Sequence, residues 1–164
     1  MKPFFFDYFR IMPDKENFFI SDYPLLLDKI SPDKNPDWGV LSLQGMIEHM
    51  TDSIGVAWKR IQQPQQYSDE ITAKSKAFML SEKPFKPGTK NSLMSEAPAA
   101  LRCPDLSAAK RELISEIQNF IEFWKKNPNE KVINPFFGNL NYEEWLHLLH
   151  KHAFHHLKQF GIEL

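Results

Sequence analysis

The sequence predicts an all-α protein built as an antiparallel bundle of four helices. Three observations support this prediction. Proline residues gather in clusters that leave four long stretches without proline, apolar residues in those stretches recur at spacings of three and four, and few segments show the period of two that is typical of strands. With 164 residues, of which 42% are hydrophobic, the chain can bury one core, and we expect a single domain over 1–164.

The first proline-free stretch predicts a helix over residues 41–63. One face of this helix carries an apolar stripe, formed by Leu43, Met46, Ile47, Met50, Ile54, Trp58 and Ile61. The second stretch, residues 68–80, is shorter and predicts a helix that turns Ile71 and Phe78 inward. Ahead of both, residues 1–37 hold five of the 12 prolines, so we expect them to form an irregular N-terminal arm that packs on the bundle.

Residues 106–126 predict the third helix. Its apolar stripe consists of Leu113, Ile114, Ile117, Phe120, Ile121 and Trp124. Asp105 or Ser107 is the expected N-cap, because a short polar side chain there accepts a hydrogen bond from a free backbone N–H of the first turn. The connection over 81–106 is longer than two neighbouring antiparallel helices need, and it is rich in proline, serine and lysine. We therefore expect a long irregular crossover there.

The fourth predicted helix spans residues 141–160. Asn141 stands in the N-cap position and Glu144 follows three residues later, which is the spacing of a capping box, while Gly161 supplies a C-terminal stop. The chain contains no Gly-rich phosphate loop and no GxSxG motif. The sequence therefore does not favour mononucleotide binding or serine-hydrolase chemistry.

Charge and cysteine content argue against several classes of function. Twenty Lys and Arg residues against 21 Asp and Glu residues give a net charge of -1, so we expect no nucleic-acid partner and no anionic membrane surface as a partner. Cys103 is the only cysteine, which excludes an internal disulfide framework and a cysteine-based zinc knuckle and fits a reducing compartment. Any metal would have to be held by histidines and carboxylates.

The N-terminus is not expected to act as an export signal. The apolar run from Met1 to Phe6 begins like one, but Asp7 and Arg10 interrupt it too early. No segment of the sequence reaches the roughly 20 apolar residues that are needed to cross a bilayer. We therefore expect a soluble cytoplasmic protein.

Two histidines near the C-terminus are the most informative residues of the chain. His152 and His156 are four residues apart, so on a helix both rings leave the same face about one turn apart and can bind one metal ion. They share this face with Trp145, Leu148 and Leu149. His147 and His150 have other helical phases and are expected to be solvated. A divalent transition metal is therefore the first hypothesis for function.

A third ligand is expected from elsewhere in the chain, because a catalytic zinc-type site usually has three protein ligands and one open position. His49 is the candidate from the first predicted helix. The small residues Gly45 and Ser53, one turn before and one turn after it, leave space for an ion and a substrate. Its phase is about 120° from the centre of the apolar stripe, so the alternative is a histidine at the edge of the core.

These residues resemble the DinB-like superfamily of metalloenzymes, in which a histidine of the first long helix is joined by an HxxHHxxQ motif in the last. The matching segments are Trp38-Gly39, Met46-Ile47-Glu48-His49, Asn134-Pro135-Phe136-Phe137-Gly138, Glu143-Glu144-Trp145 and, as the most specific, residues 152–161. The resemblance is closest to a subfamily of unknown function. It implies an up-down-down-up four-helix bundle with a divalent metal, often zinc or nickel, and it assigns the ligand positions to His49, His152 and His156.

The resemblance also implies an enzyme that uses a low-molecular-weight thiol. An open three-histidine metal site can present hydroxide or a thiolate, so a hydrolase and a thiol transferase are both candidates. The substrate would be a small molecule, with a low-molecular-weight thiol as one candidate. Glu48, Asp52 and His155 are candidate proton carriers, and Gln159 is a candidate for orienting a ligand ring or a bound water. Glu48 also follows the polar side of its helix, so the simpler interpretation is a solvated side chain.

A non-catalytic helical module remains the alternative function. In that interpretation the histidines are vestigial or structural, and a homodimer is one candidate assembly. A structural metal site normally has four protein ligands, whereas a catalytic site keeps one position open. The number of protein ligands therefore separates the two hypotheses.

Overall fold

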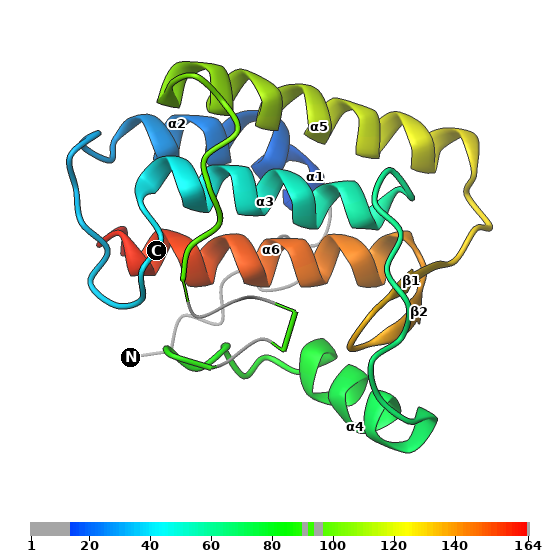
Figure 1. Ribbon diagram of the computed structural model, residues 1–164. Helices are drawn as coiled ribbons and strands as arrows, with labels where there is room; N and C mark the ends of the chain where they lie inside the picture. The colour runs from blue at the N-terminus through cyan, green and yellow to red at the C-terminus, as the bar shows by residue number, and fades with distance from the viewer. Residues whose placement is uncertain (1–13, 90–91, 94–96, 164) are drawn as a thin grey trace, which may run out of the picture.

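The computed structural model describes residues 14–89, 92–93 and 97–163 and is mostly helical (Figure 1). In chain order its elements are α1 (Asp14–Asn17), the π-helical turn η2 (Phe18–Asp22), α2 (Tyr23–Asp28), α3 (Leu43–Ala57), α4 (Asp69–Leu80), α5 (Leu106–Lys126), β1 (Val132–Asn134), β2 (Gly138–Leu140) and α6 (Tyr142–Gln159). Apart from one small two-stranded sheet, this agrees with the predicted all-α class. None of the described helices is both long enough and apolar enough to span a membrane.

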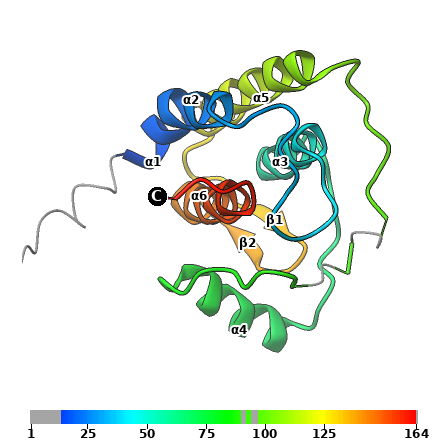
Figure 2. The same cartoon turned by 90° about the vertical axis from the view of Figure 1, so that its left-hand side faces the viewer.

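Three long helices lie side by side and enclose much of the core (Figures 1 and 2). Helix α3 packs against both α5 and α6. In Figure 1, α3 and α5 run from left to right, whereas α6 returns from right to left. The segment α1–η2–α2 contacts α5 and α6 and runs in the same direction as α6. Large side chains from these elements are fully enclosed, among them Tyr23, Met46 and Trp145.

The N-terminal arm, expected to be irregular over 1–37, is helical over 14–28. Residues 1–13 of that arm lie outside the described residues. The helical segment forms because it has an apolar face, made of the buried residues Phe18, Phe19, Tyr23 and Leu27. Pro24 does not interrupt it, because this proline lies in the first turn of α2, where its missing N–H is not needed. The prediction from proline content was therefore wrong for this segment.

Helix α3 begins two residues later and ends six residues earlier than the predicted range of 41–63. The Ser42 side chain caps its first turn by accepting a backbone hydrogen bond. The sequence pattern continued to residue 63, but Lys59 has a φ of 71° and the backbone N–H of Ile61 donates to the Gly55 carbonyl. The chain therefore leaves the helix axis, although the apolar spacing continues through this turn.

Helix α4 has nearly the predicted bounds but a different buried face. Ile71 and Phe78, which were expected to turn inward, are 49% and 39% exposed. The buried residues are Thr72 and Met79, each one position further along the chain. Helix α4 packs on α6 and β2 and lies apart from α5 (Figure 2). Its mixed sequence offers two neighbouring faces of similar polarity, so the partner surface decides which face is buried.

The caps of the two longest helices match the sequence signals. The Asp105 side chain, not that of Ser107, accepts a hydrogen bond from the first turn of α5. Asn141 and Glu144 form both halves of the predicted capping box at the start of α6. Gly161 follows α6 with a φ of 79°, a left-handed conformation that glycine adopts without strain.

A short hairpin leads into α6. Strands β1 and β2 pair antiparallel, with Asn134 opposite Gly138. The Asn134 side chain accepts hydrogen bonds from the backbone N–H groups of Phe136 and Phe137, and Gly138 has a φ of 72°. This compact turn sets the position at which α6 begins.

The long connection before α5 is irregular, as predicted. Its described residues between 81 and 105 contain no helix and no strand. In Figure 1 its last part passes across α6 and α3 to reach the start of α5. Two successive backbone N–H groups, of Arg102 and Cys103, donate to the Glu48 carboxylate on α3. This contact fixes the end of the crossover on the helix that carries His49.

Candidate metal centre

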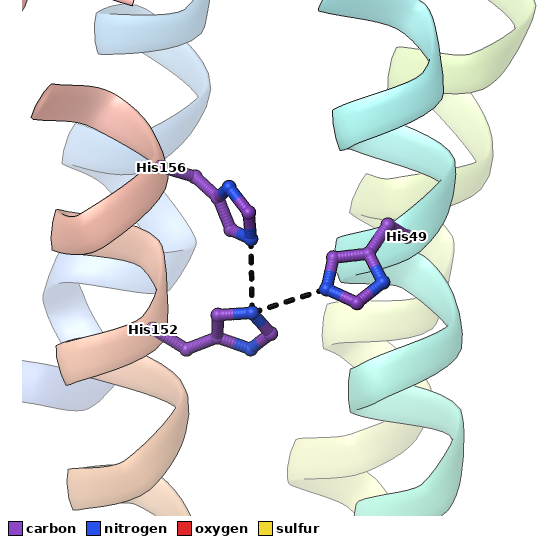
Figure 3. A group of neighbouring side chains, drawn as sticks. All are labelled: His49, His152 and His156. Carbon is purple, nitrogen blue, oxygen red and sulfur yellow. Dashed lines mark hydrogen bonds between the residues drawn. The ribbon is translucent and has the colours of Figure 1, made fainter. Parts of the chain in front are cut away.

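Three of the predicted residues, His49, His152 and His156, meet between α3 and α6 (Figure 3). One ring nitrogen from each lies within 4.8 Å of the other two. The Nε2 atom of His152 is 3.1 Å from Nε2 of His49 and 2.9 Å from Nε2 of His156. The three Nε2 atoms therefore converge on one region.

Helix geometry explains how the rings meet. His152 and His156 are one turn apart on the face of α6 that looks toward α3 (Figure 3). His49 lies off the centre of the α3 apolar stripe, and α3 packs on both α5 and α6, with the His49 ring directed toward α6 (Figure 3). His156 is buried, whereas His49 and His152 keep part of their surface exposed. The three rings are therefore not all fully enclosed.

Hydrogen bonding determines which nitrogen of His156 faces the centre. Gln159 Nε2 donates to the Trp38 carbonyl oxygen at 2.7 Å, so the amide oxygen of Gln159 must point the other way. That oxygen lies 2.8 Å from His156 Nδ1. An amide oxygen only accepts, so Nδ1 carries the hydrogen of the neutral ring. The Nε2 atom of His156 therefore presents a lone pair to the other histidines.

The His152 ring cannot satisfy both of its short contacts by hydrogen bonding. An imidazole nitrogen has one position in the ring plane, which holds either a hydrogen or a lone pair. His152 Nε2 can therefore make one good hydrogen bond, but it lies near the Nε2 atoms of both His49 and His156. A cation between the three nitrogens would accept all three lone pairs at once.

Burial keeps the three rings in the neutral form that binds metal. It lowers the pKa of His156 to about 3, with the neighbouring His49 as a further cause. Burial and the neighbouring rings of His156, His49 and His155 place the pKa of His152 well below its usual range. Burial also lowers the pKa of His49, although the charge of Asp52 partly opposes this shift. At neutral pH these imidazoles therefore need no deprotonation before they bind a metal.

The spacing of the nitrogens suits a divalent transition metal. Two imidazole nitrogens at about 2.05 Å from a tetrahedral ion lie about 3.3 Å apart. The two short contacts of His152, at 3.1 Å and 2.9 Å, are close to that separation. Within the part of the chain that the structure describes, no fourth histidine, cysteine or carboxylate joins the group. The donor set thus corresponds to a site with three protein ligands and an open position.

An aromatic wall stands beside the centre. The His155 ring lies next to that of His156, with centroids 5.3 Å apart, and is not one of the three convergent rings. It packs edge-on against Trp38 at 5.9 Å and Phe85 at 6.3 Å. The buried Trp38 Nε1 donor has no hydrogen-bond partner among the described residues. Sequence reasoning gave Trp38 and Phe85 no role, since both lie outside any helical stripe.

Glu48 has a structural role that the sequence did not indicate. It is only 5% exposed, which corrects the expectation of a solvated side chain. Its oxygens accept hydrogen bonds from Arg102 N at 2.9 Å, Cys103 N at 3.1 Å and Gln44 Nε2 at 3.0 Å. Burial alone would raise the pKa of Glu48, but these hydrogen bonds and the Arg102 charge bring it below its ordinary value. An occupied, ionised carboxylate of this kind is poorly suited to carry protons.

Asp52 is held by ion pairs on the outer side of α3. Its two oxygens lie 3.0 Å from Arg102 Nη1 and 3.5 Å from Arg60 Nη2. The side chain is 45% exposed. Because its charge raises the pKa of His49, Asp52 acts on the centre electrostatically, without a hydrogen bond to a ligand ring in the described structure.

His147 and His150, expected to be solvated, are both partly buried. His147 Nδ1 accepts from Lys15 Nζ at 2.9 Å, and its Nε2 lies 3.1 Å from the Met79 carbonyl oxygen. The His150 ring packs against Phe18, with centroids 4.8 Å apart. The reason is the helical N-terminal segment, which covers a face of α6 that the sequence alone left open.

The site is thus defined by geometry: two ligands and an orienting glutamine from α6, one ligand from α3, and an aromatic wall that includes Trp38. Comparison of the chain with protein-family models, with curated proteins and with solved structures finds no match.

Proposed function

We propose that this protein binds one divalent transition metal ion, zinc or nickel, through His49, His152 and His156. We propose further that the protein is a metal-dependent enzyme that acts on a small molecule. The observation that carries the proposal is the position of His152 Nε2, which is close to two other Nε2 atoms and can make a hydrogen bond to only one of them. A bound cation resolves this conflict. Three imidazoles suit zinc and nickel equally well, so the choice between these metals is open to measurement.

The course of the chain is compatible with this assignment. We propose that α1–η2–α2, α3, α5 and α6 make an up-down-down-up four-helix bundle of the DinB-like kind. Their directions in Figure 1 follow that order, and the long crossover precedes α5. In this proposal α4 is an additional helix that precedes the long connection and lies outside the bundle. The N-terminal segment α1–η2–α2 takes the bundle position that the sequence assigned to residues 68–80.

The residues around the centre indicate what kind of chemistry it can support. A divalent ion, when bound, supplies Lewis acidity that lowers the pKa of a coordinating water or thiol. The chain itself provides three neutral ligands, and Gln159 orients the His156 ring. Trp38, His155 and Phe85 form one wall, against which the apolar part of a small substrate would pack. Hydrolysis and thiol transfer both need a nucleophile that is activated in this way.

The open coordination position separates catalysis from a purely structural role. Protein loaded with Co²⁺ reports it by absorption, because a small thiol that enters the first coordination sphere adds a sulfur-to-cobalt charge-transfer band. We expect this band in the wild type and in His150→Ala, whose ring packs on Phe18 away from the centre. We expect no band in His152→Ala. A Co²⁺ spectrum that no small thiol or anion changes would indicate a closed structural site and contradict the enzymatic proposal.

Turnover is the second test. Zinc- and nickel-loaded protein is screened against activated esters and amides, and against electrophiles together with a low-molecular-weight thiol. The expected result is metal-dependent turnover in one of these two classes, reduced at least about 100-fold in His152→Ala and retained in His150→Ala. Equal rates in wild type and His152→Ala would show that any activity arises elsewhere.

A further inference from the structure

One side chain links the metal ligand His156 to the loop that carries Trp38. Gln159 lies one turn beyond His156 on α6 and is only 4% exposed. Its Oε1 is 2.8 Å from His156 Nδ1, and its Nε2 donates to the Trp38 carbonyl oxygen at 2.7 Å. Both ends of the amide are therefore used, and neither can be exchanged for the other.

The loop is shaped to receive this amide. The Gln159 carbonyl oxygen accepts from Asp37 N at 2.8 Å, so main chain and side chain of one residue hold the same loop. Gly39 has a φ of 80°, and a Cβ at this position would lie 2.7 Å from Gln159 Nε2. The backbone conformation therefore favours glycine, and a side chain at this position would displace the Gln159 amide.

We infer that Gln159 is a positioning residue of the metal centre. It holds the His156 ring with its hydrogen on Nδ1 and the lone pair of Nε2 toward His49 and His152. It also ties that ring to the loop that carries Trp38 and Gly39. This inference rests on the proposed function for its consequence, which is metal affinity. The ring orientation itself is a property of the metal-free protein. Neither Gln159 nor Gly39 needs to touch a substrate for this role.

The orientation is tested first by ¹⁵N NMR of the histidine rings in metal-free wild-type protein at pH 8. We expect His156 to show a protonated Nδ1 and an unprotonated Nε2. Gln159→Met keeps a side chain of similar length without an amide, so it should shift His156 toward the form with hydrogen on Nε2. Gln159→Glu keeps an acceptor for Nδ1 and should retain the wild-type form, while the lost donor to Trp38 changes the indole resonance.

Two NMR results would overturn the inference. One is a wild-type His156 ring with its hydrogen on Nε2, which requires no variant to detect. The other is an unchanged His156 ring in Gln159→Met. If Gln159→Met does not fold, the comparison of wild type with Gln159→Glu decides, because loss of the Nδ1 hydrogen in that acceptor-retaining variant contradicts the proposed contact.

Metal affinity is the second measurement, made with Zn²⁺ in competition with a chromophoric chelator. Removing an orienting partner of a ligand histidine typically weakens metal binding 10- to 100-fold, so we expect a loss of about this size in Gln159→Met and a smaller one in Gln159→Glu. Gln118→Leu, on the exposed surface of α5, is the matched control and should bind like wild type. Equal affinity in Gln159→Met overturns the positioning role. A wild type that binds no Zn²⁺ instead contradicts the proposed function, and the NMR result still decides the ring orientation.

Discussion

At the scale of single residues, the centre depends on three imidazole rings that stay neutral although they lie close together in a largely buried site. His152 and His156 lie close to each other and to His49, so a proton on any one ring would place a charge beside two further rings in a poorly hydrated site. Burial and these neighbours lower the pKa values of the folded protein. The unfolded chain has no such environment.

A pH dependence of stability follows for the metal-free protein. The pKa of His156 is about 3 when folded and about 6.5 when unfolded, so below about pH 6.5 the unfolded state binds more protons. This contribution to stability is complete above pH 6.5 and is lost as the pH falls toward 3. Urea unfolding in the presence of a chelator should show a slope that approaches about 1.4 kcal/mol per pH unit for His156 between pH 6 and 4.

The variant His156→Asn provides the comparison for this pH series. Without the imidazole, the slope of the free energy of unfolding against pH should become shallower by about 1.4 kcal/mol per unit. The absolute stability of the variant does not matter for this comparison, because only the slopes are compared. Parallel curves for the two proteins would mean that His156 titrates alike in the folded and unfolded chains.

Single-residue predictions from sequence succeeded where helical phase was sufficient. His152 and His156 share a face because they are four residues apart on one helix, and this does not depend on the rest of the fold. His49 was a candidate third ligand because of the small residues around it and because of the resemblance, but its helical phase alone put it at the edge of the core. The anchoring role of Glu48 was missed, because its partners Arg102 and Cys103 lie more than 50 residues away in the sequence.

At the scale of elements, the centre is held by the relation between α3 and α6. Helix α6 begins at a capping box and ends against the loop around Trp38, so its position along its own axis is fixed at both ends. Helix α3 is fixed by its contacts with α5 and by the crossover that Glu48 anchors. A small shift of either helix would separate His49 from the other two rings.

Removal of the Glu48 anchor tests this account of the crossover. Glu48→Ala leaves the backbone N–H groups of Arg102 and Cys103 without their acceptor, and we expect a loss of about 2–4 kcal/mol in the free energy of unfolding. Glu122→Ala, which removes an exposed carboxylate paired with Lys126, should change stability by less than about 0.5 kcal/mol. Urea denaturation of both variants makes the comparison. A loss as small as that of the control would show that Glu48 does not anchor the crossover.

Element predictions from sequence were reliable where a local signal exists. The starts of α5 and α6 and the stop at Gly161 follow from caps, which depend on a few adjacent residues. The end of α3 and the buried face of α4 did not follow, because both are set by the surface against which the segment packs. The hairpin strands have three residues each, which is too short for a pattern of period two to be recognised.

At the scale of the whole molecule, the proposed metal joins an early and a late part of the chain. His49 and His152 are 103 positions apart, so binding requires the native arrangement of α3 and α6 and is absent from the unfolded chain. A ligand that binds only the folded state stabilises it by mass action. The metal therefore couples to global folding.

Thermal unfolding measures this coupling. Free Zn²⁺ at about 100 times its Kd should stabilise the fold by about 2.7 kcal/mol, which corresponds to a rise in Tm of about 5–11 °C for a chain of this size. His49→Ala should show no such rise when Zn²⁺ is added. The Tm of each protein without metal is the reference for its own rise. A Tm that is insensitive to Zn²⁺ in the wild type would mean that no folded-state site of useful affinity exists.

The most direct test of the central claim is the metal content of the protein purified without an affinity tag, measured by elemental analysis beside His156→Ala prepared in the same way. The account predicts about one zinc or nickel ion per chain in the wild type and only trace metal in the variant. Equal trace amounts in both proteins, or equal stoichiometric amounts in both, would contradict a centre built from these three histidines.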